Sequence, residues 1–525
     1  MLCLLSALSF LPGVLQAQMV VGKDTLYGHE WTYAGQQCLK IKVARSGICR
    51  VAASSLFAAG LPPATNGSDL RLFFRGRQEA LYVSRSGALS ISDRVEFFGE
   101  KNDGSIDQYL FDQPATQQVN PAYSLFNDTA AYYLVWNHPT ATGLFWQDQP
   151  NDLTNAPPKT PWCWSTVQEV FSSTHVQREV LDYVNYSLFW GNGFAGEATT
   201  HTQLSILAPD AVTAGPDALL QMRYTTPAFG PHQTSVWVMD SLYRAHDWTG
   251  WRVQEDSCFL AAARLSSSVP FRIQSLAGGS DDHHLAFAVL RYARGFQFDM
   301  KKGMALFEIE ASGQPRYLEI NPQNMQGNTA VLYDLSTRTR LEATLANGLL
   351  RFVLPAAGTL RRCVLVSTAN GFQAPPVAPV ATRFEDYAAA QADYLIVSSR
   401  ALRRNAANNG NDEVAAYADY RSSDAGGRYR VLTVNMENIT EQFGYGTDFQ
   451  PVALRNFLQY YKKRVPALQQ VLIIGKGLDY NFFRTADEQH RYADSLFFVP
   501  SFGTPASDWP FAMRSNRIDE PLFAI

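Results

Sequence analysis

The last third of the chain alternates short apolar runs with longer stretches of helical periodicity. Val471-Leu-Ile-Ile474 is an apolar run that ends at Gly475. It is too short for a buried helix and is typical of a strand covered on both faces of a sheet. Residues 451–464 begin with proline, which the first turn of a helix tolerates, and place apolar side chains on one face. The pattern predicts a helix over 451–464 followed by a central strand over 471–474.

Two more strands are predicted upstream, at 394–397 and 429–434, with a helix between them from about 412 to 425. That helix ends at Gly426-Gly427, a common stop signal. Strands that alternate with helices of this length imply right-handed crossovers and a parallel sheet. We therefore predict an α/β domain in this part of the chain.

The carboxyl ends of parallel strands form the edge where ligands and reacting groups collect. Here that edge carries Gly475-Lys476-Gly477 and Asp479. The segment lacks the third glycine of a dinucleotide fingerprint and the Gly-Lys-Ser/Thr ending of a phosphate-binding loop. We expect the functional cleft at this edge and no nucleotide cofactor in it.

The residues before 373 show a different pattern, in which short alternating strands are broken by turns. Asn347-Gly348 predicts a hairpin turn, because both residues tolerate positive φ. Regular short strands of this kind favour sandwiches. Strands are predicted near 39–43, 48–52, 70–74, 94–98, 220–224, 285–292, 306–309, 349–353 and 363–366, and the stretch 127–136 is predicted to end in an apolar, aromatic strand.

These patterns predict a multidomain β plus α/β protein. We expect a signal peptide over 1–18, an N-terminal β domain over 19–150, a β-sandwich-like domain over 151–372, a proline-rich connector over 373–383 and an α/β domain over 384–525. The connector contains Pro375, Pro376 and Pro379, which stiffen a linker.

The N-terminal segment is apolar from residue 2 to 15, and Ala17 lies just before a plausible cleavage point. It resembles a secretory signal peptide, although it lacks a positive n-region, and an ordinary buried segment is the alternative. No other run approaches the ~20 apolar residues of a spanning helix, so we expect no transmembrane helix. The net charge of -4 gives no basic surplus, which argues against a nucleic-acid partner.

The five cysteines beyond the signal segment are odd in number and widely spaced, so they do not form a disulfide framework. We expect each to be a small buried hydrophobe. A hairpin turn predicted at 45–47 would keep Cys38 and Cys49 apart by register. They are Cys38, Cys49, Cys163, Cys258 and Cys363.

Two groups of polar residues suggest metal sites at first sight. The cluster Asp281-Asp-His-His284 lacks partner ligands with zinc-like spacing, so we expect an exposed loop. Asp103 and Asp107 lack the alternating oxygen ligands of a calcium loop, so we expect a solvated turn. We predict no metal ion.

Several short motifs are distributed over nearly the whole chain. They are Ala392-Asp-Tyr-Leu-Ile-Val397, Ala418-Asp-Tyr-Arg421, Phe443-Gly-Tyr-Gly446, Leu454-Arg-Asn-Phe-Leu458 and Val471 to Gly475, with Val95-Glu-Phe-Phe-Gly99, Asn102-Asp-Gly104 and Tyr123 to Tyr132 in the N-terminal half. Together they resemble the gingipain-type cysteine peptidases, and among these the sortase-like peptidases of type IX secretion. The resemblance implies a caspase-like peptidase domain, export to the outer membrane, cell surface or medium, and secreted proteins and secretion-system components as partners.

Peptidases of this family use a cysteine thiolate with an imidazole nearby. In this chain the last cysteine, Cys363, precedes the α/β domain, and the only later histidine is His490. The Gly-Asp-Gly that usually follows the family's central strand is here Gly475-Lys476-Gly477. We therefore predict no catalytic residue, a chain that ends before the His/Cys dyad, and no activity of the chain alone.

Asp479 and Asp519 are the candidate substrate-binding residues of the cleft. A second hypothesis is a non-catalytic cell-surface module, in which the β domains bind partners and the peptidase-like domain is degenerate. The two hypotheses differ in whether a histidine motif and a later cysteine accompany this sequence.

Overall fold

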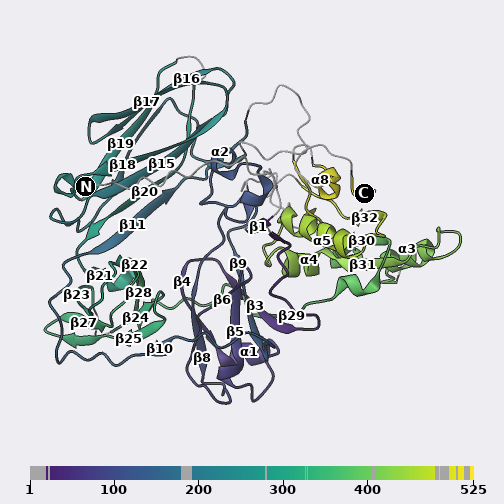
Figure 1. The fold of residues 1–525 in the computed structure, drawn as a ribbon, viewed down its shortest axis with the longest axis horizontal. Helices are drawn as coiled ribbons and strands as arrows, with labels where there is room; N and C mark the ends of the chain where they lie inside the picture. Colours follow the sequence, from purple (N-terminus) through teal and green to yellow (C-terminus); the bar gives the residue numbers. More distant parts are fainter. Residues whose placement is uncertain are drawn as a thin grey trace.

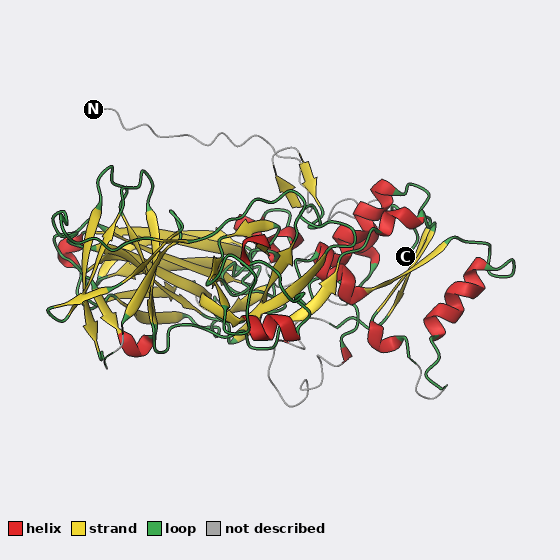
Figure 2. Cartoon of the chain, turned by 90° about the horizontal axis from the view of Figure 1, so that it is seen from below, coloured by secondary structure: helices red, strands yellow, loops and turns green. Residues whose placement is uncertain are grey.

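The computed structural model describes residues 19–21, 24–178, 192–277, 281–325, 327, 329–404, 409–478, 484, 496–503, 506–513 and 521–525. These residues form a β-rich molecule with a smaller α/β unit at one end. Figure 1 shows the β-sheets of the first 370 residues on one side and the helices of the C-terminal part on the other. The same separation of strands and helices is visible in Figure 2.

The N-terminal β unit is a sandwich of two sheets, with strand orders β29-β3-β9-β5-β6 and β4-β8-β7. Side chains that alternate along the strands fill the space between the sheets, among them the fully buried Leu39, Leu72 and Phe97. The strands are β3 (Gln37–Val43), β4 (Gly47–Ala52), β5 (Leu70–Phe74), β6 (Arg77–Glu79), β7 (Tyr82–Val83), β8 (Arg94–Gly99), β9 (Ala130–Trp136) and β29 (Val380–Arg383). The hairpin β1 (Met19–Val21) and β2 (Asp24–Leu26) precedes them, and α1 (Ala53–Ala58), η1 (Gly67–Asp69), η2 (Asp107–Leu110) and α2 (Pro114–Gln117) are short helices.

The hairpin predicted at 45–47 is wrong. β3 pairs with β9 and β29, whereas β4 pairs with β8 in the opposite sheet. The bend at 44–46 therefore carries the chain from one sheet of the sandwich to the other. Cys38 and Cys49 consequently lie in different sheets, and both are free and buried, as are the other three described cysteines.

The middle of the chain builds one nine-stranded sheet, in the order β10-β25-β24-β28-β22-β11-β20-β15-β18. Two separate four-stranded sheets cover it, β14-β19-β16-β17 and β21-β23-β27-β26. Each small sheet encloses its own apolar core, one around Leu220 and Val269 and one around Leu318 and Phe352. The part of 151–372 that the structure describes thus holds two apolar cores, one under each small sheet.

The strands of this middle region follow in chain order. They are β10 (Gln147–Asp148), β11 (Cys163–Val170), β12 (Thr174–Val176), β13 (Gly193–Ala195), β14 (His201–Leu207), β15 (Ala218–Thr226), β16 (Pro231–Val238), β17 (Ser241–Thr249), β18 (Arg252–Leu260), β19 (Ser268–Ser275), β20 (His284–Arg294), β21 (Gln297–Asp299), β22 (Met304–Ile309), β23 (Arg316–Gln323), β24 (Ala330–Asp334), β25 (Thr339–Glu342), β26 (Thr344–Ala346), β27 (Leu349–Leu354) and β28 (Arg361–Ser367), with η3 (Ala262–Arg264) and η4 (Met300–Lys302). The predicted turn is confirmed: Asn347 and Gly348 have φ of 52° and 74° between β26 and β27.

The cluster at 281–284 is not an exposed loop. Asp281 and His283 are 3% and 0% exposed. His232 lies 2.6 Å from the Asp281 carboxylate, and the two ring nitrogens of His283 lie 2.9 Å from the hydroxyls of Thr202 and Ser275. Neighbouring strands therefore supply a hydrogen-bond partner for each of these buried groups. Among the described residues, no group of three or more His, Cys, Asp or Glu could hold a metal ion.

The turn near Asp107 is also more buried than expected, because it lies against the α/β unit. The Asp107 side chain is fully buried. Its carboxylate accepts hydrogen bonds from the Leu125 N–H at 2.7 Å and from the Gln450 side-chain amide at 2.6 Å. Burial raises the pKa of Asp107 to about 6. Asp107 thus connects the N-terminal sandwich to the beginning of helix α5.

The α/β unit has a parallel sheet, as predicted, with strand order β31-β30-β32. Its strands are β30 (Tyr394–Ser398), β31 (Val431–Asn435) and β32 (Gln470–Ile474), and its helices are η5 (Tyr387–Ala390), η6 (Arg400–Leu402), α3 (Glu413–Ser422), α4 (Met436–Phe443), α5 (Pro451–Arg464) and α8 (Trp509–Ala512). None of the described helices has the length and apolar character needed to cross a membrane.

The middle strand is β30 rather than the predicted 471–474. All five residues of β30 are buried, whereas only Val471 of β32 is. β32 has a second neighbour in Ala524, whose carbonyl accepts the Val471 N–H at 2.8 Å. The apolar run of β32 therefore correctly predicted a strand inside the sheet. The most buried strand of that sheet, however, is β30.

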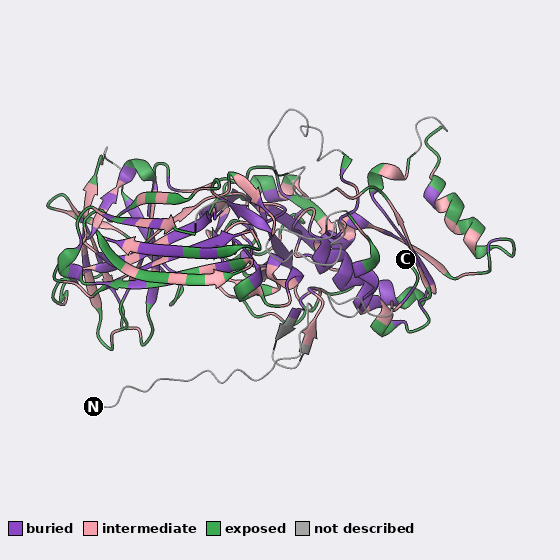
Figure 3. Cartoon of the chain, turned by 90° about the horizontal axis from the view of Figure 1, so that it is seen from above, coloured by how far each residue is buried: buried purple, intermediate pink, exposed green. Residues whose placement is uncertain are grey.

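Helix α5 is enclosed on nearly all sides and does not bury a single apolar face (Figure 3). The polar residues Arg455 and Gln459 are 3% and 7% exposed. Arg455 donates to the Tyr109 carbonyl at 2.5 Å, and Gln459 donates to the Met513 carbonyl at 2.6 Å. These bonds offset the cost of burying polar side chains, and the Arg455 bond fixes α5 against the N-terminal β unit.

The segment 373–383, expected to be a connector, is hydrogen-bonded to the N-terminal sandwich at both ends. The Gln373 N–H donates to the Ile48 carbonyl at 2.9 Å. At the other end, β29 forms an antiparallel ladder with β3. The α/β unit therefore follows directly from a strand of the sandwich.

Candidate functional site

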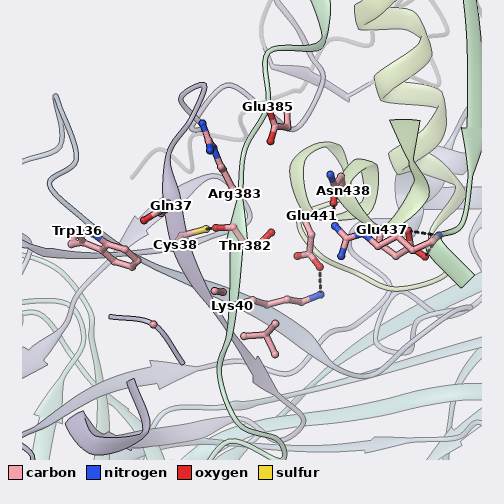
Figure 4. A pocket seen from close by; sticks show the side chains of 14 residues that line it. Gln37, Cys38, Lys40, Trp136, Thr382, Arg383, Glu385, Glu437, Asn438 and Glu441 are labelled. Atoms are coloured by element: carbon pink, nitrogen blue, oxygen red, sulfur yellow. Dashed lines mark hydrogen bonds and ion pairs between the residues drawn. The ribbon is translucent and has the colours of Figure 1, made fainter. Parts of the chain in front are cut away.

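A groove lies between helix α4 and the N-terminal sandwich, beside the carboxyl ends of β30 and β31. Its main part has a volume of about 440 Å³. Strands β3 and β29 form one wall, and Glu437, Asn438 and Glu441 of α4 form the other (Figure 4). A second part of about 200 Å³ shares Glu437 and Glu441 and continues to Ser399 and residues 497–500.

Ionic contacts across this groove hold α4 against the sandwich. The Lys40 Nζ lies 2.8 Å from the Glu441 carboxylate and 3.7 Å from that of Asp448. The Tyr133 hydroxyl donates to the other oxygen of Glu441 at 2.5 Å. Burial alone would lower the pKa of Lys40, but the carboxylates of Glu441 and Asp448 outweigh it and raise that pKa. The two carboxylates therefore favour the cationic form of Lys40.

The loop after β30 is fixed to the first turn of α4. The Glu437 carboxylate accepts the Ser399 hydroxyl at 2.6 Å and the Arg400 N–H at 3.1 Å. The Arg400 guanidinium donates to the Asn438 side chain. The carboxylate of Glu437 is placed near the amino end of a helix, where negative charge is favourable. These bonds give the sheet edge a rigid, polar rim.

The turn after β32 was expected to open onto the functional cleft, but other residues cover it. A Cβ atom at Gly475, whose φ is 152°, would lie 2.7 Å from a methyl of Val499, and one at Gly477 would lie 2.3 Å from the Ser501 hydroxyl. The Phe498 N–H donates to the Lys476 carbonyl at 3.0 Å. Residues 498–501 thus cover the turn, and only glycine allows this close approach.

The α/β unit, which supplies one wall of the groove, coincides with a segment that matches a known family. Residues 387–525 match the model of peptidase family C25. This segment is a C25 peptidase domain. A search of curated protein sequences found no match to the chain.

Among solved structures, the chain is similar to dimeric latent PorU from Porphyromonas gingivalis. The TM-score is 0.55 at 15% identity, over 92% of this chain and 46% of that one. This chain therefore spans about half the length of that protein, and the similarity at this identity concerns the fold. A family 35 carbohydrate-binding module from Clostridium thermocellum and a CBM36-1 domain from the hindgut metagenome of Trinervitermes trinervoides give TM-scores of only 0.15 and 0.16, at 10% and 8% identity. The matches cover 24% and 25% of this chain and 97% and 98% of those two chains, and we infer nothing from them.

The structure does not test the residues that were singled out from the sequence. Asp479, His490 and Asp519 fall outside the described residues. Conversely, sequence reasoning missed Lys40 and Glu441, which are far apart in the chain. The available signal was the run Leu39-Lys-Ile-Lys42, which puts two lysines on one face of β3.

None of the five cysteines in the described part of the chain is suited to act as a nucleophile. Burial raises the pKa of Cys49 and Cys163 to about 12, and it raises the pKa of Cys38, Cys258 and Cys363. Cys38 lines the groove, yet its thiol points to the Thr382 carbonyl at 3.8 Å. These groups are neutral thiols at neutral pH, and cysteine chemistry requires the thiolate.

Proposed function

We propose that the chain provides the β domains and the first part of the peptidase domain of an exported gingipain-type cysteine peptidase. Its substrates would be secreted proteins, processed at the cell surface in the manner of the sortase-like peptidases of type IX secretion. The observation that carries this proposal is a polar groove between the C25 segment and the N-terminal sandwich, beside the carboxyl edge of the parallel sheet. The fold similarity to PorU over 92% of the chain supports it.

The groove has properties that suit a polypeptide substrate. Its volume of about 440 Å³ lies in the range of ligand sites. Charged side chains of both signs line it, so a peptide could be oriented as well as bound. Because the N-terminal sandwich supplies one wall, it would be part of the substrate site and not merely a support.

The remaining features of the proposal come from the sequence. The signal-like segment 1–18 supports export, and Asp479 and Asp519 stay proposed as cleft residues. A caspase-like arrangement of the whole peptidase domain is proposed from the family.

We expect the 525-residue chain alone to show no thiol-dependent peptidase activity. A cysteine peptidase needs a thiolate and a base within about 3 Å of each other, and the described cysteines are buried thiols. The test is to express this chain and, in parallel, the product of the gene's whole reading frame. Both are assayed for cleavage of unfolded protein and for labelling by a thiol-alkylating probe.

The matched variants replace Cys38 and Cys258 by serine in both forms. The proposal predicts that only the whole-frame product cleaves and that neither substitution changes its rate. Cleavage by the 525-residue chain that either substitution abolishes would contradict it. A whole-frame product that binds unfolded protein but never cleaves it would favour a non-catalytic cell-surface module.

A further inference from the structure

Strand β29 is an edge strand that pairs with β3 on one side and has its other side in the groove. It occupies the end of the five-stranded sheet, next to β3. All four of its residues line the groove, and Val380 is 58% exposed. In Figure 4 the strand that carries Thr382 and Arg383 lies between Cys38 of β3 and the α4 residues Asn438 and Glu441. Its free edge therefore faces α4 across the groove.

The hydrogen-bond register of β29 shows which backbone groups are free. The Phe384 N–H donates to the Gln36 carbonyl at 3.1 Å, so residue 384 points its backbone toward β3. Residues two apart in a strand point the same way, which places the backbone groups of Thr382 and Val380 on β3 as well. The N–H and C=O of Ala381 and Arg383 point to the opposite edge. Within the described residues, no hydrogen bond reaches these groups from outside the ladder.

We propose that β29 binds an extended peptide segment of a protein substrate as an added strand. The N–H and C=O groups of Ala381 and Arg383 would form hydrogen bonds with the peptide backbone. The side chains that line the groove would contact the peptide's side chains and so select among sequences. This inference deepens the proposed function and rests on it for the identity of the ligand as a protein substrate. The bound strand would run along the groove toward the sheet edge at Ser399 and Glu437.

The geometry favours a single peptide strand over a second copy of this chain. An added strand needs about 4.8 Å beside β29 in the hydrogen-bonding direction. The facing wall, formed by α4, is anchored to the sandwich through Lys40 and Glu441. Because α4 faces the free edge of β29, a single extended chain suits this groove better than the edge of another folded sheet, which α4 would obstruct. The charged lining, with Arg383 and Arg400 near Glu385 and Glu437, suits the mixed side chains of a polypeptide.

The test uses the full 525-residue chain and fluorescein-labelled, unfolded β-casein as the probe, with binding followed by fluorescence anisotropy. Ala381→Pro removes an outward N–H while leaving the β3 ladder its donors, because residue 381 does not donate to β3. Ala381→Val keeps the N–H and is the matched control. We expect Ala381→Pro to weaken casein binding about fivefold, as one lost hydrogen bond should, and Ala381→Val to leave it unchanged.

Hydrogen–deuterium exchange of the wild-type chain gives a second measurement that needs no variant. The amides of the peptide covering 380–385 should exchange at least several-fold more slowly when casein is bound. Unchanged exchange there, or equal casein affinity of folded Ala381→Pro and the wild type, would overturn the inference. So would a dimer of this chain that Ala381→Pro dissociates while casein binding persists.

These results are separate from the test of peptidase activity. If the whole-frame product cleaves casein but Ala381→Pro binds it normally, the β29 inference fails and the proposed function stands. If β29 binds casein and no form cleaves, the binding inference stands and the proposed activity fails.

Discussion

Replacing Lys40 by alanine is expected to lower the free energy needed to separate helix α4 from the N-terminal sandwich by about 3 kcal/mol. The Lys40 side chain is 8% exposed and lies between the carboxylates of Glu441 and Asp448. Its removal would leave Glu441, with a side chain only 17% exposed, as a nearly buried charge with no opposite partner. Breaking such a pair by removing one partner costs more than the pair contributes when intact.

Lys42 offers the matched control on the same face of the same strand. It pairs with Asp448 at 2.8 Å, but both side chains are about one-third exposed. Lys42→Ala should therefore cost no more than about 1 kcal/mol. The measurement is hydrogen–deuterium exchange of the α4 amides, which reports local opening. Equal exchange rates in the two variants would contradict the role given to Lys40.

Replacing Arg361 by alanine is expected to destabilise the middle sandwich by about 4 kcal/mol. Arg361 and Asp334 are 1% and 0% exposed, and their charged groups lie 2.5 Å apart. The other oxygen of Asp334 accepts the N–H groups of Ser336 and Thr337 at 3.0 and 3.1 Å. Without Arg361 the Asp334 carboxylate keeps these two bonds but loses the charge that compensates its burial.

The neighbouring Arg362 provides the control. It pairs with Glu100 at 2.8 Å, and both side chains are more than 40% exposed. Arg362→Ala should cost at most about 1 kcal/mol. Urea unfolding followed by tryptophan fluorescence measures both variants. A loss below 1 kcal/mol for Arg361→Ala would show that Asp334 is solvated or protonated once its partner is gone.

Local signals in the sequence were sufficient for much of the secondary structure. Asp412 predicts the start of α3, and its carboxylate accepts the Ala415 N–H at 2.9 Å as a helix cap does. The run 70–74 predicts β5 at its observed bounds. These features depend on neighbouring residues only, so the pattern of a short window contains them.

Pairing between distant strands could not be predicted in the same way. Alternation shows which side chains of β3 and β4 face inward, but not that the two strands belong to different sheets. The groove could not be predicted for a related reason. Its residues Lys40 and Glu441 are 401 positions apart in the sequence, and no local pattern links them. Strand β29 was not predicted, because the proline-rich segment before it is typical of a connector. Val380–Arg383 forms a strand by pairing with β3, which a short sequence window does not show.

The central claim is that the groove between β29 and α4 receives an extended protein chain, and photo-crosslinking tests it most directly. A benzophenone side chain is introduced at Asn438, on the groove wall, and at Ser92, an exposed residue that does not line the groove. Each variant is irradiated with unfolded β-casein. We expect casein adducts at Asn438 and only background at Ser92, with Ala381→Pro reducing the Asn438 adduct. Equal yields at the two positions would contradict it.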